Sequence, residues 1–160
     1  GQLSGLGELG KHGSLISPEL GSSFRLCAVS TDMPLEPDGP EDYGIDEICA
    51  KCNICERFCP GDAISNHKKT VAGVTRWVID PPACQPYFYG LYGCKICLMV
   101  CPFNAKGNLK ESFKPVAADI RKAKDATGLI AMIQKRSNLS IDHIEDFKKH
   151  EHEYWLVNLN

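Results

Sequence analysis

The feature that most constrains this chain is a run of four closely spaced cysteines and a proline at residues 49–60, CAKCNICERFCP. The C-x2-C-x2-C-x3-C-P spacing is that of thiolate runs that hold cubane iron–sulfur clusters. In this wiring the first three cysteines bind one cluster and the fourth binds a second one, so a partner run is required. The sequence therefore predicts two clusters.

The partner run lies at residues 94–102, CKICLMVCP, and repeats the last three cysteines and the proline. Regular spacing would place its first cysteine at position 91, where the chain has leucine, and the nearest upstream candidate is Cys84. The predicted ligands of the first cluster are Cys49, Cys52, Cys55 and Cys101, and those of the second are Cys59, Cys84, Cys94 and Cys97.

Two other uses of these cysteines fit the pattern less well. Disulfide frameworks are typical of small secreted chains, whereas these cysteines stand in tandem runs with no signal peptide in view. Zinc sites favour two separated pairs, and a third cysteine two residues further on has no role there. We favour iron–sulfur clusters over zinc, and zinc over disulfides.

Length and charge limit the remaining possibilities. The 160 residues make one ordinary domain or two small ones. A net charge of −2 argues against a general nucleic-acid surface, since neutralising phosphates requires a basic face. No apolar run approaches the length of a membrane span. We therefore expect a soluble, mildly acidic protein.

The cysteine runs predict an α+β fold built around a bacterial two-cluster ferredoxin-like module at residues 41–106. Within it we expect a helical turn at 62–65 and a strand at 75–80. Four aromatic residues between Cys84 and Cys94 are expected to shield the clusters from water. They are Tyr87, Phe88, Tyr89 and Tyr92.

The segments on either side of the module have patterns of their own. Residues 1–40 include a predicted short strand at 21–31, with Cys27 as a buried core thiol, and a proline-rich break at 33–40. Residues 107–160 are predicted to be a helical tail, with a helix that starts at Pro115 and another through 129–133. Ser140 is expected to cap a last helix. The histidines there, His143, His150 and His152, are assigned to a solvated face.

A glycine-rich stretch, GLGELGKHG, occupies residues 5–13. Its G-x-G-x-x-G pattern is not a dinucleotide site, because only four residues precede Gly5 and a strand must come first. Glycines this dense allow the backbone to approach a flat or bulky ligand closely. A plain glycine-rich turn is the alternative, and the stretch alone does not decide between them.

Taken together, several stretches resemble the corrinoid-dependent reductive dehalogenases. They are the glycine-rich stretch, residues 15–21 (LISPELG), 31–35 (TDMPL), both cysteine runs, 77–80 (WVID) and 84–88 (CQPYF). The resemblance covers roughly residues 3–105. The epoxyqueuosine reductases share the glycine-rich stretch and the two-cluster architecture, but the residues of these motifs are more similar to those of the dehalogenases.

The resemblance implies a fold, a reaction and partners. It implies that residues 1–40 are the C-terminal edge of a nitroreductase-like corrinoid domain, and that electrons pass through two [4Fe-4S] clusters to a cobamide that removes halide from an organohalide. The residues it places near the corrinoid, through their backbone, are Gly7, Gly10, Lys11, His12 and Gly13. The implied partners are an upstream corrinoid domain or partner chain and a ferredoxin-type, flavodoxin-type or quinol-linked electron donor.

The length of the chain departs from the family, whose members have several hundred residues. The resemblance places the proton-donating tyrosine and most of the corrinoid pocket before residue 1, so no catalytic residue is assigned here. We expect either a C-terminal piece of a longer enzyme or a short chain that needs a partner. The location, cytoplasmic or exported to a periplasmic membrane surface, stays open. The alternative functions are a free-standing two-cluster electron carrier and a tRNA-modifying epoxyqueuosine reductase.

Overall fold

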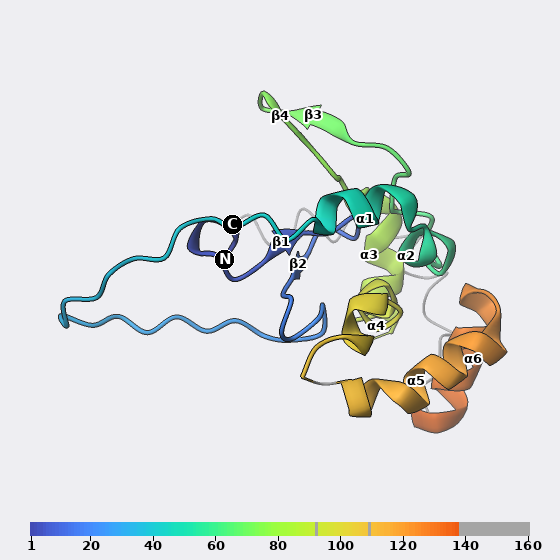
Figure 1. The fold of residues 1–160 in the computed structure, drawn as a ribbon. Coiled ribbons are helices and arrows are strands. Elements are labelled where there is room, and N and C mark those ends of the chain that lie inside the picture. The colour runs from blue at the N-terminus through green and yellow to red at the C-terminus, as the bar shows by residue number, and fades with distance from the viewer. Residues whose placement is uncertain (92, 109, 138–160) are drawn as a thin grey trace, which may run out of the picture.

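The computed structural model describes residues 1–91, 93–108 and 110–137 (Figure 1). Short helices and two small hairpins alternate along the chain, and two longer helices follow them. In order, the elements are η1 (Gln2–Ser4), β1 (Glu8–Leu9), β2 (Leu15–Ile16), α1 (Ile45–Lys51), α2 (Ile54–Arg57), β3 (Lys69–Val71), β4 (Val74–Arg76), α3 (Pro81–Gly90), α4 (Ile96–Met99), η2 (Pro102–Ala105), α5 (Lys110–Ala123) and α6 (Ala126–Ser137).

The glycine-rich stretch forms the antiparallel hairpin β1–β2, in which Glu8 pairs with Ile16. Gly7 has φ +148, and a Cβ there would lie 2.0 Å from the carbonyl oxygen of Ile16, so only glycine fits. The hairpin also supports α1, because the Glu8 carboxylate accepts a hydrogen bond from the Ile45 N–H at 2.7 Å. An acid at a helix N-terminus satisfies a free N–H and complements the helix dipole.

The strand that we predicted within residues 21–31 is wrong. No helix or strand forms between residues 24 and 43, which extend away from the other elements as a long excursion (Figure 1). Leu26 and Val29 are 58% and 88% exposed, and Cys27 is exposed rather than buried. Apolar and β-branched residues favour strands only where a neighbouring strand and a core receive them, and the described chain supplies neither here.

Two apolar cores hold the cysteine runs. The smaller one joins the N-terminal hairpin to α1, and its buried members are Ile16, Ile45, Cys49, Trp77 and Cys101. The larger one lies among α2, α4 and α6, and its buried members are Cys55, Phe58, Ile64, Leu91, Ile96, Val100, Leu129 and Ile130. Both cores contain cysteines, so packing and the candidate sites are built from the same residues.

The segment between the two cysteine runs differs in part from the prediction. The helical turn predicted at residues 62–65 is wrong, because Asp62 has φ +49 and Ile64 forms a β-bridge with Ile79. The strand predicted at 75–80 is confirmed only in part, as β4 in the exposed hairpin β3–β4 and as the bridge at Ile79. Tyr87 packs on the larger core, whereas Phe88 and Tyr89 are nearly half exposed, and Tyr92 lies outside the described residues. Shielding of the clusters by these aromatic residues stays a prediction.

Helices α5 and α6 pack against each other after the module. Helix α5 begins at Lys110, five residues before the predicted start, so Pro115 lies inside the helix. The predicted helix through 129–133 is confirmed within α6, and Leu129 and Ile130 enter the larger core. Ser140, His143, His150 and His152 lie outside the described residues. None of the helices described here combines the length and the apolar character that crossing a membrane requires.

Candidate iron–sulfur centres

All eight predicted ligands lie on or beside the short helices, and all are free thiols. Cys49 is in α1 and Cys55 in α2, while Cys84 is in α3 and Cys97 in α4. Helices α2 and α4 pack against each other, which brings the two cysteine runs together. We call Cys49, Cys52, Cys55 and Cys101 the first set, and Cys59, Cys84, Cys94 and Cys97 the second set.

The thiols of the first set lie close enough to interact electrostatically. Burial raises the pKa of Cys55 to about 12, and the neighbouring Cys49, Cys101 and Cys52 add to the shift. The pKa of Cys101 is also raised, first by burial and then by Cys52. Cys101 belongs to the second run, so the fold brings it back to the first run as the crossed wiring requires.

The second set is assembled in the same way. Burial raises the pKa of Cys97 to about 12, with smaller contributions from Cys94 and Cys59 and a further one from Cys55 of the first set. Burial raises the pKa of Cys94 to about 11, and Cys84 and Cys59 add to it. Cys84 therefore lies near Cys59 and Cys94, and its role as the fourth ligand of this set stays a prediction.

A close backbone contact positions Cys59 and Cys84. A Cβ at Gly61 would lie 2.2 Å from the carbonyl oxygen of Ala83, so this turn and helix α3 approach each other as only glycine allows. The turn also directs the Ala63 N–H to the sulfur of Cys59, at 3.3 Å. The Cys-Pro-Gly sequence therefore ends the first run and places Cys59 next to the helix that carries Cys84.

Hydrogen bonds to sulfur come from different places in the two sets. In the second set the donors are nearby backbone N–H groups, from Ala63 to Cys59, Ile96 to Cys94 and Leu98 to Cys97. In the first set Cys55 and Cys101 also have such local donors, at Glu56 and Phe103. Two further donors come from the N-terminal segment: the backbone N–H of Lys11 to Cys49, and the hydroxyl of Ser22 to Cys101.

Ser22 is part of a buried polar network beside Cys101. Its N–H donates to Asn104 Oδ1 at 2.9 Å, and its hydroxyl lies 2.8 Å from the carbonyl oxygen of Leu98. The hydroxyl has one proton, so the Leu98 carbonyl, the Asn104 oxygen and the Cys101 sulfur compete for it. A charged thiolate is the strongest acceptor of the three. We therefore expect the Ser22 hydroxyl to donate to Cys101 when Cys101 is deprotonated.

Lys11 is fully buried beside the first set. Its ammonium donates to Asn53 Oδ1 at 2.6 Å, lies 3.8 Å from Glu56 Oε2, and sits 4.8 Å from the centroid of the Trp77 ring. Asn53 and Glu56 belong to the first cysteine run. Nothing in the sequence indicated this contact, because a lysine in a glycine-rich turn is usually exposed and its partners lie more than forty residues away.

His12 is also buried, at 2% exposure. Its Nδ1 accepts a hydrogen bond from the Ser14 N–H at 3.2 Å, and its Nε2 has no partner among the described residues. Burial lowers the pKa of His12 from 6.5 to about 4. The imidazole is therefore neutral near pH 7, with its proton on Nε2.

The five predicted corrinoid contacts all lie in or beside the hairpin β1–β2. The structure buries Gly7, Gly10, Lys11 and His12 and leaves Gly13 partly exposed. The Lys11 side chain is occupied inside the chain, and its backbone N–H donates to Cys49. The five corrinoid contacts stay predictions.

The cysteines do not close around a single ion. Across residues 1–91, 93–108 and 110–137, no three His, Cys, Asp or Glu side chains gather so as to share one metal ion. A cubane is held differently, because each of its four thiolates binds a separate iron atom at a corner of the cluster. A cubane site therefore requires four thiols placed around one cluster, and N–H or O–H groups that donate hydrogen bonds to their sulfurs.

Comparison with known protein families decides what this arrangement is. A family described as the 4Fe-4S dicluster domain matches residues 48–105, from α1 to the end of η2. The chain contains a 4Fe-4S dicluster domain. Both cysteine runs lie inside it, together with the hairpin β3–β4 and helix α3.

Curated relatives extend the similarity beyond the dicluster domain. The chain is 39% identical to the tetrachloroethene reductive dehalogenase of Sulfurospirillum multivorans, over 66% of this chain and 23% of that protein. It is 38% identical to the trichloroethene reductive dehalogenase of Dehalococcoides mccartyi, over 68% of this chain and 20% of the relative. An epoxyqueuosine reductase of Lactococcus garvieae is 37% identical over 63% of this chain and 30% of its own length.

A solved structure gives the same result for the fold. The catabolic reductive dehalogenase NpRdhA superposes on 80% of this chain with a TM-score of 0.56 and 23% identity, and the match covers 21% of that protein. The resemblance to the reductive dehalogenases is therefore confirmed, with a ferredoxin-like iron–sulfur domain of mixed helix and strand. The chain spans less than a third of the length of each of these relatives.

Proposed function

We propose that this chain is the electron-relay part of a corrinoid-dependent reductive dehalogenase, with one [4Fe-4S] cluster on each set of four cysteines. The observation that supports the proposal is the grouping of eight thiols into two interacting sets, each with one member from the opposite run, the second set also including Cys84 from α3. Cys55 and Cys97 also interact across the two sets. The similarity to tetrachloroethene and trichloroethene reductive dehalogenases supports the reaction class.

The residues present fit two cubane clusters. When bound, each cluster takes up and releases one electron at a time. The thiols with raised pKa values must lose their protons to bind iron, so loading releases protons and couples to folding. The N–H groups of Ala63, Ile96 and Leu98 then stabilise negative charge on the sulfurs of the second set. Tyr87 and the larger core keep water from that site.

The exposed excursion at residues 24–43 supports an upstream corrinoid domain or partner chain. Leu26, Val29, Met33 and Leu35 are each more than half exposed along it. Four exposed apolar side chains on one segment without regular structure are typical of a surface that another chain or domain covers. The glycine-rich hairpin begins the same N-terminal segment, and we propose that its backbone, from Gly7 to Gly13, approaches the cobamide.

A free-standing two-cluster electron carrier is the alternative, since the dicluster domain alone explains the cysteines. It gives no role to the apolar excursion or to the similarity outside residues 48–105. Reduction of epoxyqueuosine is a further alternative, supported by relatives that bear that name. It would require a surface for tRNA, and the net charge of −2 does not favour one.

Anaerobic metal analysis tests the proposal. We would purify this chain, and any longer reading frame that contains it, and measure iron, acid-labile sulfide and cobalt. About eight irons per chain are expected, since each cubane has four. The longer form should also hold cobalt and release halide from tetrachloroethene when reduced. Full iron without cobalt, even after cobamide is added to the longer form, would favour the electron carrier instead.

A further inference from the structure

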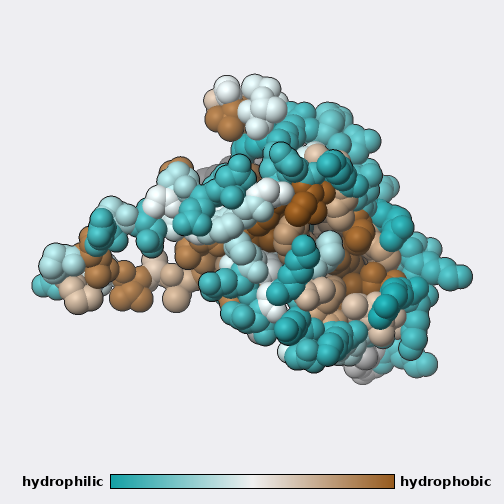
Figure 2. Space-filling model, viewed as in Figure 1, coloured by the Kyte–Doolittle hydropathy of each residue, from teal (hydrophilic) through white to brown (hydrophobic). Residues whose placement is uncertain are grey.

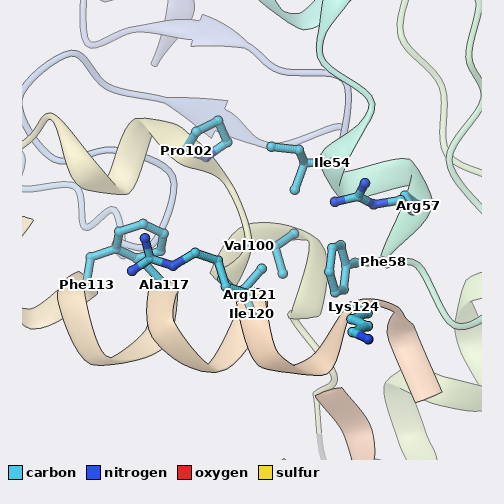
Figure 3. A pocket seen from close by; sticks show the side chains of 10 residues that line it. All are labelled: Ile54, Arg57, Phe58, Val100, Pro102, Phe113, Ala117, Ile120, Arg121 and Lys124. Carbon is cyan, nitrogen blue, oxygen red and sulfur yellow. The ribbon is translucent and has the colours of Figure 1, made fainter. Parts of the chain in front are cut away.

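A pocket of about 530 Å³ opens between the dicluster domain and helix α5 (Figure 3). Ile54, Phe58 and Val100 line it on the side of the cysteine runs, and Phe113 and Ile120 line it on the side of α5. The space-filling view shows apolar side chains in the middle of the face that it presents, with hydrophilic residues around them (Figure 2). The pocket is therefore an apolar depression with a polar rim.

The charge on the pocket has one sign. Arg57, Arg121 and Lys124 line it, and no acid is among the described residues that line it. All three side chains are exposed, and none forms an ion pair with a described residue. Arg57 also lies over the Phe58 ring, 5.1 Å from its centroid. The net charge of the chain is −2, so three exposed cations around one apolar depression make this surface locally positive.

The pocket lies directly against the candidate clusters. Ile54 precedes Cys55 of the first set, Phe58 precedes Cys59 of the second, and Val100 precedes Cys101 of the first. Neighbouring Cα atoms are about 3.8 Å apart. The residues on this side of the pocket are therefore in the same turns as the predicted ligands of both clusters. Electrons tunnel efficiently over short distances only, and a redox group held in this pocket would be close to both sets.

We propose that this pocket is the docking site of a small acidic electron-donor protein that carries a low-potential iron–sulfur cluster. This rests on the proposed electron-relay function. The carboxylates of the donor pair with Arg57, Arg121 and Lys124, and an apolar contact of the donor covers Phe58 and Val100. One electron leaves the cluster of the donor, which is oxidised, and enters a cluster of this chain, which is reduced. Arginine and aromatic residues are enriched at such interfaces, and opposite charges steer association.

The test compares two double charge reversals in helix α5 and the residue that follows it. Arg121→Glu with Lys124→Glu reverses two of the three rim cations, and Lys114→Glu with Lys122→Glu changes the net charge equally at exposed positions that do not line the pocket. The full chain, loaded with clusters, is mixed anaerobically with a reduced acidic [2Fe–2S] ferredoxin, and the rate of electron transfer is followed at low and high salt. Dithionite serves as a reductant that needs no docking site.

The pocket variant should accept electrons from the ferredoxin at least about tenfold more slowly at low salt, and the control less than about twofold more slowly. Dithionite should reduce all three proteins equally. If both variants are slowed equally, or if neither is slowed, the pocket is not the docking site. The proposed electron-relay function would be unaffected by that result. A dimer that only the pocket variant loses would assign the pocket to a second copy. Clusters that no reductant reduces would overturn the relay and the docking site together.

Discussion

The two sets of cysteines share their chemistry but are supported by different parts of the chain. The second set takes its sulfur hydrogen bonds from backbone within a few residues of each cysteine. The first set also depends on Lys11 and Ser22, which are far from it in sequence. One set is thus supported locally, whereas the other is completed by the N-terminal segment that also carries the apolar excursion. A change in that segment should therefore reach the first set and spare the second.

The largest expected effect comes from removing one ligand of each set. Cys55→Ser and Cys97→Ser should each lose one cluster, about half of the iron and sulfide, because a serine hydroxyl is a poor replacement for thiolate. Both should also destabilise the domain, since cluster binding contributes to folding. Iron and sulfide analysis with electron paramagnetic resonance of the reduced proteins checks this. Two full clusters in either variant would contradict the ligand assignment.

Lys11→Met should affect the first set only. It keeps the packing on Trp77 but leaves Asn53 and the half-buried Glu56 without their cation, at a cost of about 2 kcal/mol. Anaerobic thermal melting should show a midpoint lower by about 5 °C, with earlier loss of one cluster. Lys51→Met, at an exposed position of α1, is the matched control. Equal loss of both clusters in Lys11→Met would remove the distinction between the sets.

His12 should make the stability of the N-terminal hairpin depend on pH. Its pKa is about 4 in the folded chain and 6.5 as a free side chain, so below pH 6.5 the unfolded state binds the proton first. Folding stability should fall as pH decreases, by about 1.4 kcal/mol between pH 7.5 and 5.5. Melting at the two pH values, compared between the unsubstituted chain and His12→Gln, measures the difference. His67→Gln, a substitution at an exposed histidine, is the matched control.

The smallest effect is expected at Ser22. A hydrogen bond to a ligand sulfur stabilises the reduced, more negative state of a cluster, so Ser22→Ala should lower the reduction potential of the first cluster. The shift should be about 20–40 mV, which corresponds to a hydrogen bond of somewhat under 1 kcal/mol. A redox titration followed by electron paramagnetic resonance separates the two clusters. Ser22→Thr keeps the hydroxyl and should restore the potential, whereas a purely structural role would not be restored.

Cysteine spacing predicted the parts of the molecule in which local sequence decides the geometry. The dicluster domain follows from two short cysteine runs with proline and glycine at their turns. The division of the cysteines into two ligand sets, with Cys84 in the second, stays a prediction. Identification of the iron itself stays a prediction until metal is measured. The helix through residues 129–133 was predictable because its apolar positions repeat with a helical period.

The errors arose where distant residues decide the local structure. Residues 24–29 have strand propensity but no partner strand in the described chain, and residues 62–65 are extended because Ile64 meets Ile79. The start of α5 was placed at Pro115, since proline is common in a first turn, whereas the helix begins five residues earlier. The roles of Lys11 and Ser22 depend on contacts across the chain, which no local pattern records.

The return of Cys101 to the first run has a consequence for biogenesis. A ribosome delivers Cys49, Cys52 and Cys55 well before Cys101, and Cys59 well before Cys94 and Cys97. With the proposed ligand assignment, neither set of four thiols is complete until the second run has left the ribosome. Iron delivered during translation would meet only partial sites, so loading is expected to follow release of the chain. Both clusters would then enter in one late event, and a chain cut between the runs would hold neither.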